Sequence, residues 1–188
     1  MSSLLKLSVA LLVSGVAFTA FAQQKLVPAQ SEIVFVSKQM GVAVDGRFKK
    51  FDAQLSFDPA KLDTSKINFT VDMASATLGV PESDAELPKP TWFSIAKFPQ
   101  ATFASSSIKA LGGGKFDVAG KLSIKGQARD VVVPVTMVQT GATTVATGQL
   151  PIKRLAFKIG EGEWADTSMV ADDVQVKFKF SLTGVGKL

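Results

Sequence analysis

The end of the chain carries the pattern that most constrains its fold, an alternation of apolar and polar residues. Between positions 174 and 182 every second residue is apolar, these residues being Val174, Val176, Phe178, Phe180 and Leu182. Since successive side chains of a strand point to opposite faces, a period of two places the apolar residues on one side. The same alternation occurs at 54–57, 67–73 and 121–125. These segments are predicted to be antiparallel strands with one buried and one solvated face.

Turn signals separate the alternating segments and indicate the number of strands. Turns containing glycine or proline stand between them, at 58–59, 112–114, 125–126 and 140–141. Sustained helical periodicity is scarce. Gly46 and Gly120 interrupt two of the strands, where they are predicted to mark bulges or bends that help close a small barrel. The expected fold class is therefore all-β, with roughly eight antiparallel strands forming a barrel.

One insertion, from Val80 to Pro99, departs from this pattern. Its four prolines exclude a long helix, although 82–87 and 91–97 could each form a short turn or helix. The Trp92-Phe93 pair within it needs an apolar surface to cover. We expect a short helical flap that closes one end of the barrel.

The first 22 residues have the features of a secretory signal peptide. A single Lys precedes an apolar run at 7–18, and Ala20-Phe21-Ala22 supplies the small residues that signal peptidase recognises. The apolar run is shorter than the ~20 residues that cross a bilayer. We expect cleavage before Gln23, export to a bacterial periplasm, and a single domain over residues 23–188.

Two missing residue types limit the chemistry that the chain can perform. It has no His and no Cys, which excludes His-dependent triads, His-ligated zinc or copper sites, thiol catalysis and disulfides. The net charge of +5 is spread along the chain without a dense Lys/Arg run, so no nucleic-acid partner is expected. No catalytic residue, metal or cofactor is predicted. Attraction to an anionic membrane surface stays open.

An acidic segment precedes the last predicted strand. The stretch GEGEWADTSMVADD, at 160–173, places five carboxylates around Trp164. Their spacing does not match the alternating ligands and closing Glu of a calcium loop. Lys153, Arg154 and Lys158 lie just upstream and could neutralise them across a hairpin. We expect a rim loop with structural ion pairs, in which Trp164 could cap one mouth of the barrel. The alternative is a carboxylate-dependent enzyme, such as a glycosidase with paired acids.

The aromatic residues raise the question of whether the barrel is filled or hollow. The chain has 14 Phe and two Trp but no Tyr. A barrel of about eight strands can be filled by such side chains or can hold one small ligand. A cavity walled by Phe, Met and Leu would favour a long hydrocarbon, because each buried methylene contributes about 0.8 kcal/mol. The same apolar faces serve both possibilities, so the residues alone do not separate them.

Six motifs follow one another in an order and spacing that resemble the YceI-like family. They are Ser31-x-Ile33-x-Phe35, Val44-Asp-Gly-Arg-Phe48-x-x-Phe51, Phe57-Asp-Pro59, Trp92-Phe93-x-x-x-x-Phe98-Pro-x-x-x-Phe103, Val118-x-Gly-x-Leu-x-Ile-x-Gly126 and Arg154-x-x-Phe157-x-Ile-Gly160. The resemblance covers nearly the whole chain after the signal peptide. It implies a lipocalin-like barrel in the periplasm that binds a polyisoprenoid or isoprenoid quinone, without enzymatic activity. It also implies links to stress response and to cytochrome b561-type membrane proteins.

The chain departs from that family at one position. Many members have a His shortly after the first strand, where this sequence has Ser37-Lys38-Gln39-Met40-Gly41. If that His meets the head group of a ligand in relatives, Lys38 or Gln39 has to replace it here. Arg154 is a further candidate to meet a polar head.

The leading hypothesis is a periplasmic carrier for an isoprenoid lipid, which is released when the flap opens. The cavity is expected to be lined by side chains from apolar strand faces and from the flap, namely Phe35, Phe57, Phe69, Met73, Trp92, Phe93, Phe103, Leu122, Ile124, Phe178 and Phe180. Transient contact with the inner membrane or with a cytochrome b561-type protein is expected. A ligandless barrel that acts through its surface in a stress or redox complex is the second rival, and whether the chain forms a homodimer stays open.

Overall fold

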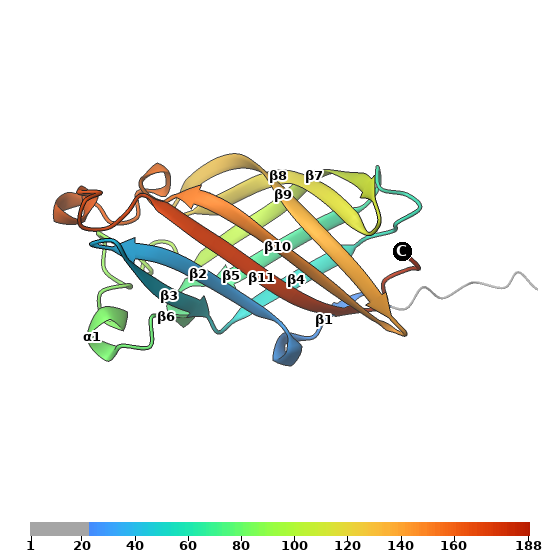
Figure 1. The fold of residues 1–188 in the computed structure, drawn as a ribbon, viewed down its shortest axis with the longest axis horizontal. Coiled ribbons are helices and arrows are strands. Elements are labelled where there is room, and N and C mark those ends of the chain that lie inside the picture. Colours follow the sequence, from blue (N-terminus) through green and yellow to red (C-terminus); the bar gives the residue numbers. More distant parts are fainter. Residues whose placement is uncertain (1–22) are drawn as a thin grey trace, which may run out of the picture.

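The computed structural model of the protein describes residues 23–188. The predicted signal peptide lies outside these residues and stays a prediction. Within them, no helix is both long enough and apolar enough to cross a membrane. The elements are almost all strands (Figure 1).

Eleven strands and five short helical segments make up the fold of residues 23–188. The strands are β1 (Lys25–Leu26), β2 (Glu32–Gln39), β3 (Val42–Phe48), β4 (Phe51–Ser56), β5 (Lys66–Asp72), β6 (Ala76–Thr77), β7 (Gln100–Gly112), β8 (Lys115–Ile124), β9 (Gln127–Thr140), β10 (Thr143–Lys153) and β11 (Asp173–Thr183). The helical segments are η1 (Pro28–Gln30), η2 (Met73–Ser75), α1 (Pro81–Asp84), η3 (Arg154–Phe157) and η4 (Gly162–Ala165). All strands join one antiparallel sheet in the order β4-β5-β7-β8-β9-β10-β11-β2-β3-β6, with β1 paired to β11.

The strand order begins with β4 and β5 and ends with β3 and β6. These four strands form two longer strands that bend, because β3 continues into β4 and β5 continues into β6. Only Lys49 and Lys50 separate β3 from β4, and η2 alone separates β5 from β6. The bent pair stays together, because β3 pairs with β6 and β4 pairs with β5. Across the bend, Lys49 N donates to Ser75 O at 3.1 Å and Asp72 N donates to Lys50 O at 3.0 Å. Counting each bent strand once and leaving out β1, the wall has eight strands, which confirms the predicted all-β barrel.

Local turn chemistry explains the hairpins that join neighbouring strands. At Lys125-Gly126, between β8 and β9, both residues have positive φ angles, 48° and 72°. Two consecutive positive φ angles give a tight turn whose twist matches that of the flanking strands. The three glycines at 112–114, from the last residue of β7 to the residue before β8, also have positive φ angles, as their predicted turn requires. The β2–β3 hairpin uses Met40 in the same conformation, with a φ of 48°.

The insertion at 80–99 forms the expected flap at one end of the barrel. Its helical part is α1, which begins at a proline that needs no N–H partner. The second expected segment, 91–97, consists of turns, and Ser94 there has a φ of 51° that no helix continues through. Leu87 and Phe93 of the flap are buried in an apolar cluster with Met73 and other residues. The flap and the η3–η4 loops lie at one end of the barrel, and β1 and the C-terminus lie toward the other (Figure 1).

Candidate functional site

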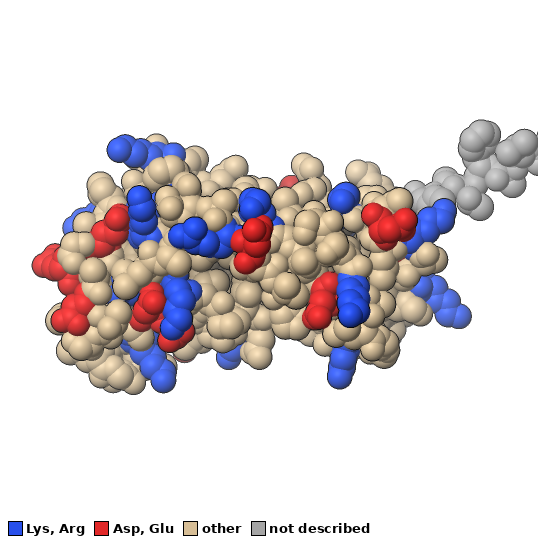
Figure 2. Space-filling model, turned by 90° about the horizontal axis from the view of Figure 1, so that it is seen from above, with Lys and Arg blue, Asp and Glu red and all other residues tan. Residues whose placement is uncertain are grey.

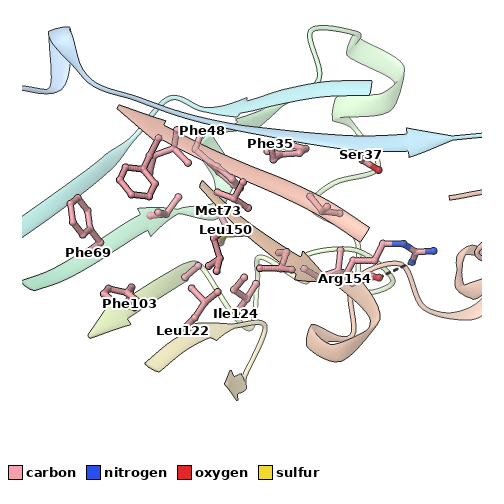
Figure 3. Close-up of a pocket in the computed structure, with 18 of the residues that line it drawn as sticks. Phe35, Ser37, Phe48, Phe69, Met73, Phe103, Leu122, Ile124, Leu150 and Arg154 are labelled. Carbon is pink, nitrogen blue, oxygen red and sulfur yellow. Dashed lines mark hydrogen bonds between the residues drawn. The ribbon is translucent and has the colours of Figure 1, made fainter. Parts of the chain in front are cut away.

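The interior of the barrel holds an apolar cavity of ≈ 340 Å³. This volume falls at the lower end of the ~300–1,000 Å³ that small-molecule sites occupy. Side chains from opposite parts of the wall point into the same space (Figure 3). The expected residues that line it are Phe35, Phe69, Met73, Trp92, Phe93, Phe103, Leu122, Ile124, Phe178 and Phe180, together with Gln39, Arg154 and Trp164. Contact of any of them with a ligand stays a prediction. A hollow barrel counts against the filled, ligandless alternative.

Three of the wall phenylalanines lie over a glycine of the neighbouring strand. Phe35 is the register partner of Gly46, and Phe178 is the partner of Gly148. A Cβ built on either glycine would collide with the ring that covers it, and Phe103 lies in the same way over Gly120. Each ring therefore occupies the space that a larger residue at the glycine position would need for its side chain. Bulges or bends were expected at Gly46 and Gly120. A register shift between Ser105 and Ser107 lies next to Gly120 in the β7–β8 pairing, whereas Gly46 pairs in regular register and the bend of its strand comes later, at Lys49 and Lys50.

The end of the barrel near the termini is closed by packed aromatic rings. Phe57 and Phe116 meet edge to face there, with centroids 5.4 Å apart. Gln24 fixes the Phe57 backbone, since its amide nitrogen donates to Phe57 O at 2.5 Å and its oxygen accepts from Phe57 N at 2.8 Å. The expectation that Phe57 lines the cavity is wrong, because the residue follows β4 and packs into the core cluster beneath.

The other end of the cavity is a mouth where the polar lining residues gather. The polar side chains of the wall are Ser37 and Gln39 from β2, Ser83 and Glu86 from the flap, and Arg154 from η3. Ser37 and Arg154 lie toward the same end in Figure 3. Lys38, the other expected head-group residue of β2, is exposed and does not line the cavity, because alternation along the strand turns its side chain away from the lining Ser37 and Gln39. Its contact with a ligand stays a prediction.

Two tryptophans border this mouth. The rings of Trp92, from the flap, and Trp164, from η4, lie 5.5 Å apart at an interplanar angle of 48°. Both line the cavity. The Nε1 atom of Trp92 is buried and makes no hydrogen bond to a described residue. The structure thus places Trp164 where a cap on the mouth was expected, with Trp92 as its packing partner.

Arg154 is buried, and its guanidinium group is saturated with hydrogen bonds. Its five N–H groups donate to five backbone carbonyls at 2.6–3.0 Å, those of Ile159, Gly160, Trp164, Val170 and Ala171. The side chain is 2% exposed. Burial lowers the pKa of Arg154, and the nearby Asp172 carboxylate opposes that shift. Since Arg has five N–H donors, none remains for a ligand. Arg154 lines the cavity but has no free donor for a polar head, so the expected contact stays a prediction without support from the hydrogen bonds; the side chain holds the 159–171 loop against the barrel.

The carboxylates of the acidic segment do not gather into a group that could hold a metal ion in the described part of the chain. Glu161 pairs with Lys125 at 3.0 Å, and the Lys125 side chain is 5% exposed. Asp173 pairs with Lys153 at 2.7 Å, and Asp172 accepts from Leu155 N at 2.9 Å. Across residues 23–188, no three Asp or Glu side chains come together as metal ligands would. These acids fasten the rim loop instead, so nothing in their arrangement favours the enzyme alternative.

A loop carboxylate, Asp166, shows how the segment is held internally. Its Oδ1 accepts from Ser168 Oγ at 2.7 Å and from Ser168 N at 2.9 Å. These two hydrogen bonds, the side-chain one first, lower the pKa of Asp166. Asp166 therefore stays ionised at neutral pH as part of a local turn.

Sequence reasoning missed several residues of the cavity wall. Phe48 shares its face of β3 with Gly46 and packs against Phe35 and Phe93, with centroids 5.3 Å and 6.2 Å away. Its alternation with Val44 was a signal that could have found it. Ala146 and Leu150 of β10 also line the cavity. Small and mixed residues in that strand weaken the alternation, and only pairing with β11 reveals the inward face.

Solved structures share this barrel. The crystal structure of BcnA from Burkholderia cenocepacia is 50% identical, covers 83% of this chain and 98% of its own, and has a TM-score of 0.80. A polyisoprenoid binding domain from Saccharophagus degradans is 16% identical, covers 86% of this chain and 98% of its own, and has a TM-score of 0.70. At that identity the second likeness shows the fold alone.

Curated sequences are also similar to this chain. A UPF0312 protein of Ectopseudomonas mendocina is 31% identical over 145 residues, which cover 73% of this chain and 76% of the relative. A UPF0312 protein of Vibrio cholerae is 27% identical over 157 residues, covering 78% and 83%. A YceI-like domain matches residues 24–182, nearly all of the described chain, so this protein belongs to the YceI-like family.

Proposed function

We propose that this protein is a periplasmic carrier that binds an isoprenoid lipid, such as a polyisoprenoid or an isoprenoid quinone, inside the barrel and catalyses no reaction. The apolar cavity of ≈ 340 Å³ carries this proposal. Its walls are built from Phe, Leu, Ile, Val and Met, and the few polar side chains stand at the mouth. Burial of hydrocarbon in such a site contributes roughly 25 cal/mol of binding free energy per Å² of apolar surface, whereas a polar metabolite finds few hydrogen-bond partners there.

The relatives support a binding role over an enzymatic one. The same barrel occurs in the domain from S. degradans that is described as polyisoprenoid binding. Glu161, Asp166 and Asp172 of the rim loop beside the cavity are engaged in contacts that hold this loop in place. Export to the periplasm rests on the signal-peptide pattern at 1–22. A role in stress response, with delivery to a cytochrome b561-type membrane protein, is part of the proposal.

Exposed apolar side chains beside the mouth support a transient contact with the inner membrane. Met40 and Val42, in the β2–β3 hairpin, are 70% and 68% exposed, and Met169 is 41% exposed. Met40 N donates to Met169 O at 2.8 Å, which joins the hairpin to the rim loop. Val80, at the start of the flap, is 48% exposed. These residues adjoin Gln39, Ser83 and Val170 of the lining, so a lipid that leaves the mouth meets them first.

Extraction of the protein from its native periplasm tests the carrier function. Purification without detergent, organic extraction and mass spectrometry should give about one isoprenoid lipid per protein. Delipidated protein should bind added isoprenoid quinone saturably, read as quenching of the two tryptophans, both of which line the cavity. If the extract holds no stoichiometric lipid and the quinone shows no saturable binding, the carrier function fails.

A matched pair of variants links binding to the cavity. Leu122 lines the cavity, and Lys121 beside it in β8 is exposed. Leu122→Trp should reduce the recovered lipid because the larger ring fills the space that the lipid needs. Lys121→Trp adds the same ring outside and should leave the amount of lipid unchanged. Circular dichroism and the melting temperature establish that both variants fold.

A further inference from the structure

We infer that the barrel wall parts along a seam between β9 and β10, and that this seam lets the cavity widen for isoprenoid chains too large for the resting cavity. This inference rests on the proposed function and deepens it by naming what sets the size of the ligand. A cavity of about 150 Å³ holds one benzene molecule, so the resting ≈ 340 Å³ holds roughly two such rings. A long isoprenoid chain therefore needs a wall that gives way.

The seam follows from the pairing of the strands. β9 and β10 pair from their shared turn only as far as Val135 and Gly148. Beyond these residues, the 127–134 part of β9 pairs with β8 alone, and the 149–153 part of β10 pairs with β11 alone. These two stretches of adjacent strands thus lack the hydrogen-bonded ladder that joins the rest of β9 to β10. We call the line between them the seam.

Two prolines explain why the ladder stops there. Met137 N donates toward the β7–β8 turn at 2.7 Å, so the even-numbered residues of β9 direct their N–H and C=O groups toward β10. In the register of the paired part, the next residues to exchange hydrogen bonds would be Pro134 and Gln149. The pair after it would be Val132 and Pro151. Each pair contains a proline, which has no N–H to donate, so neither can form both of its hydrogen bonds.

No ion pair joins the two unpaired stretches, 127–134 and 149–153. Asp130 of β9 pairs with Lys121 of β8 at 2.8 Å. Lys153 of β10 pairs with Asp173 of β11 at 2.7 Å. Each ion pair therefore fastens its strand to the neighbour on the other side. Figure 2 looks onto the side where β7 and β8 lie uppermost in Figure 1, and its charged side chains are scattered over a mostly uncharged surface.

Side chains close the seam at the rim of the barrel. Arg129 Nη2 of β9 donates to Ala156 O of η3 at 3.1 Å. Lys125 Nζ, in the β8–β9 turn, pairs with Glu161 Oε2 of the rim loop at 3.0 Å. The paired part of β9 and β10 holds the opposite end of the seam. The strands can therefore part in the middle while the barrel stays closed at both ends.

Apolar side chains border the seam inside and outside. Val133 of β9 and Leu150 of β10 line the cavity. On the outer face Val132 is 54% exposed, and Pro134 and Pro151 are exposed as well. Apolar contacts have no preferred direction, so a hydrocarbon chain can replace the contacts that the strands make with each other. Parting the wall here breaks no backbone ladder, whereas parting two fully paired strands would break one.

A reversible lock across the seam tests the inference. Because the chain has no Cys, Val132→Cys with Pro151→Cys introduces a single pair of thiols on the outer face, which join when the strands approach. Binding is read as displacement of N-phenyl-1-naphthylamine from delipidated protein. The locked form should bind the long alcohol solanesol about tenfold or more weakly than the reduced form, the effect of leaving about two methylene groups unburied. The short alcohol farnesol should bind both forms equally.

A matched control lies in the paired part of the same two strands. Thr136 and Thr147 are register partners, so Thr136→Cys with Thr147→Cys locks a position that is already joined. This lock should change the binding of neither alcohol. Equal binding of solanesol by the locked and reduced seam variant, an equal loss for both alcohols, or thiols at 132 and 151 that never join overturns the inference.

A second variant closes the seam without a cross-link. Pro134→Val with Pro151→Val supplies the two missing N–H groups and leaves the lining unchanged, because both positions face outward. The ladder should then extend, which slows hydrogen exchange at 149–153, and solanesol should again bind more weakly while farnesol does not. Unchanged binding of solanesol despite slower exchange contradicts the inference. If neither alcohol displaces the probe from the unmodified protein, the carrier function itself fails, and the seam has no ligand to admit.

Discussion

At the scale of single residues, the width of the cavity depends on glycines that leave room for aromatic rings of the neighbouring strand. A Cβ on Gly46 would meet three ring atoms of Phe35 and no other group as closely. Gly46→Ala should therefore turn the Phe35 ring into the cavity, where it narrows the space near the mouth. We expect weaker binding of long isoprenoid chains and a loss of about 1–3 kcal/mol in the free energy of unfolding, as over-packing usually costs. Probe displacement and urea unfolding measure the two effects.

Two further variants isolate the steric cause. Phe35→Leu combined with Gly46→Ala shortens the ring that collides, so the double variant should bind long chains better than Gly46→Ala alone. Gly186→Ala adds a Cβ that meets Pro59 Cδ at 3.5 Å, an ordinary contact, and should have little effect. Unchanged binding in Gly46→Ala would show that the ring does not set the width of the cavity.

Arg154 is the residue whose loss should cost the most stability. Its five donors satisfy carbonyls that are otherwise buried with it. Arg154→Lys keeps the charge but supplies at most three donors, which leaves at least two carbonyls unpaired. We expect the free energy of unfolding to fall by roughly 2–6 kcal/mol, from about 1–3 kcal/mol for each of two unpaired groups. Lys153→Met, which breaks an exposed ion pair next to it, should cost only ~0–1 kcal/mol. Similar unfolding midpoints for both variants would contradict this role.

At the scale of elements, one carboxylate ties the flap to the barrel. Asp84 of α1 accepts from Thr77 Oγ1 of β6 and from Leu78 N, both at 2.5 Å. The Thr77 hydroxyl first, and then the Leu78 N–H, lower the pKa of Asp84 below its ordinary value of 3.8. A carboxyl whose pKa is lowered by folding stabilises the folded state above its unfolded pKa and loses this contribution as the pH falls through its folded pKa. Acid below about pH 4 should therefore loosen the flap.

Hydrogen exchange of residues 77–87 measures this loosening. The amides of this segment should exchange faster at pH 3 than at pH 5, after correction for the intrinsic pH dependence of exchange. Asp84→Asn should show faster exchange already at pH 7 and little further change in acid, because the amide cannot accept both bonds as a charged carboxylate does. Glu82→Gln, at the exposed neighbouring acid, should behave as the unmodified protein does. A flap equally protected in Asp84→Asn would rule out this tie.

At the scale of the whole molecule, features that rest on interactions between residues close in sequence could be predicted, and features that rest on distant partners could not. Strands and hairpins rest on alternation and local turn chemistry, and the barrel was predicted correctly for that reason. The roles of Gly46 and Arg154 depend on partners that folding brings close: a ring on the next strand and carbonyls on a distant loop. Lys38 and Gln39 show a third limit, because neighbouring residues of a strand face opposite ways and only the register decides which one points inward.

The hollow barrel has a thermodynamic consequence that belongs to the molecule as a whole. A ligand that binds only the folded chain stabilises it by RT ln(1 + [L]/Kd), about 2.7 kcal/mol when the lipid is at 100 times its Kd. For a domain of this size, that free energy raises the melting temperature by about 5–10 °C. Delipidated protein should therefore melt lower than the protein purified with its lipid, and added isoprenoid quinone should restore the difference in calorimetry. Leu122→Trp, whose ring fills part of the cavity, should lose most of this response while keeping a cooperative transition. An unchanged melting temperature across delipidation and reloading would mean that the cavity holds no ligand of consequence to the fold.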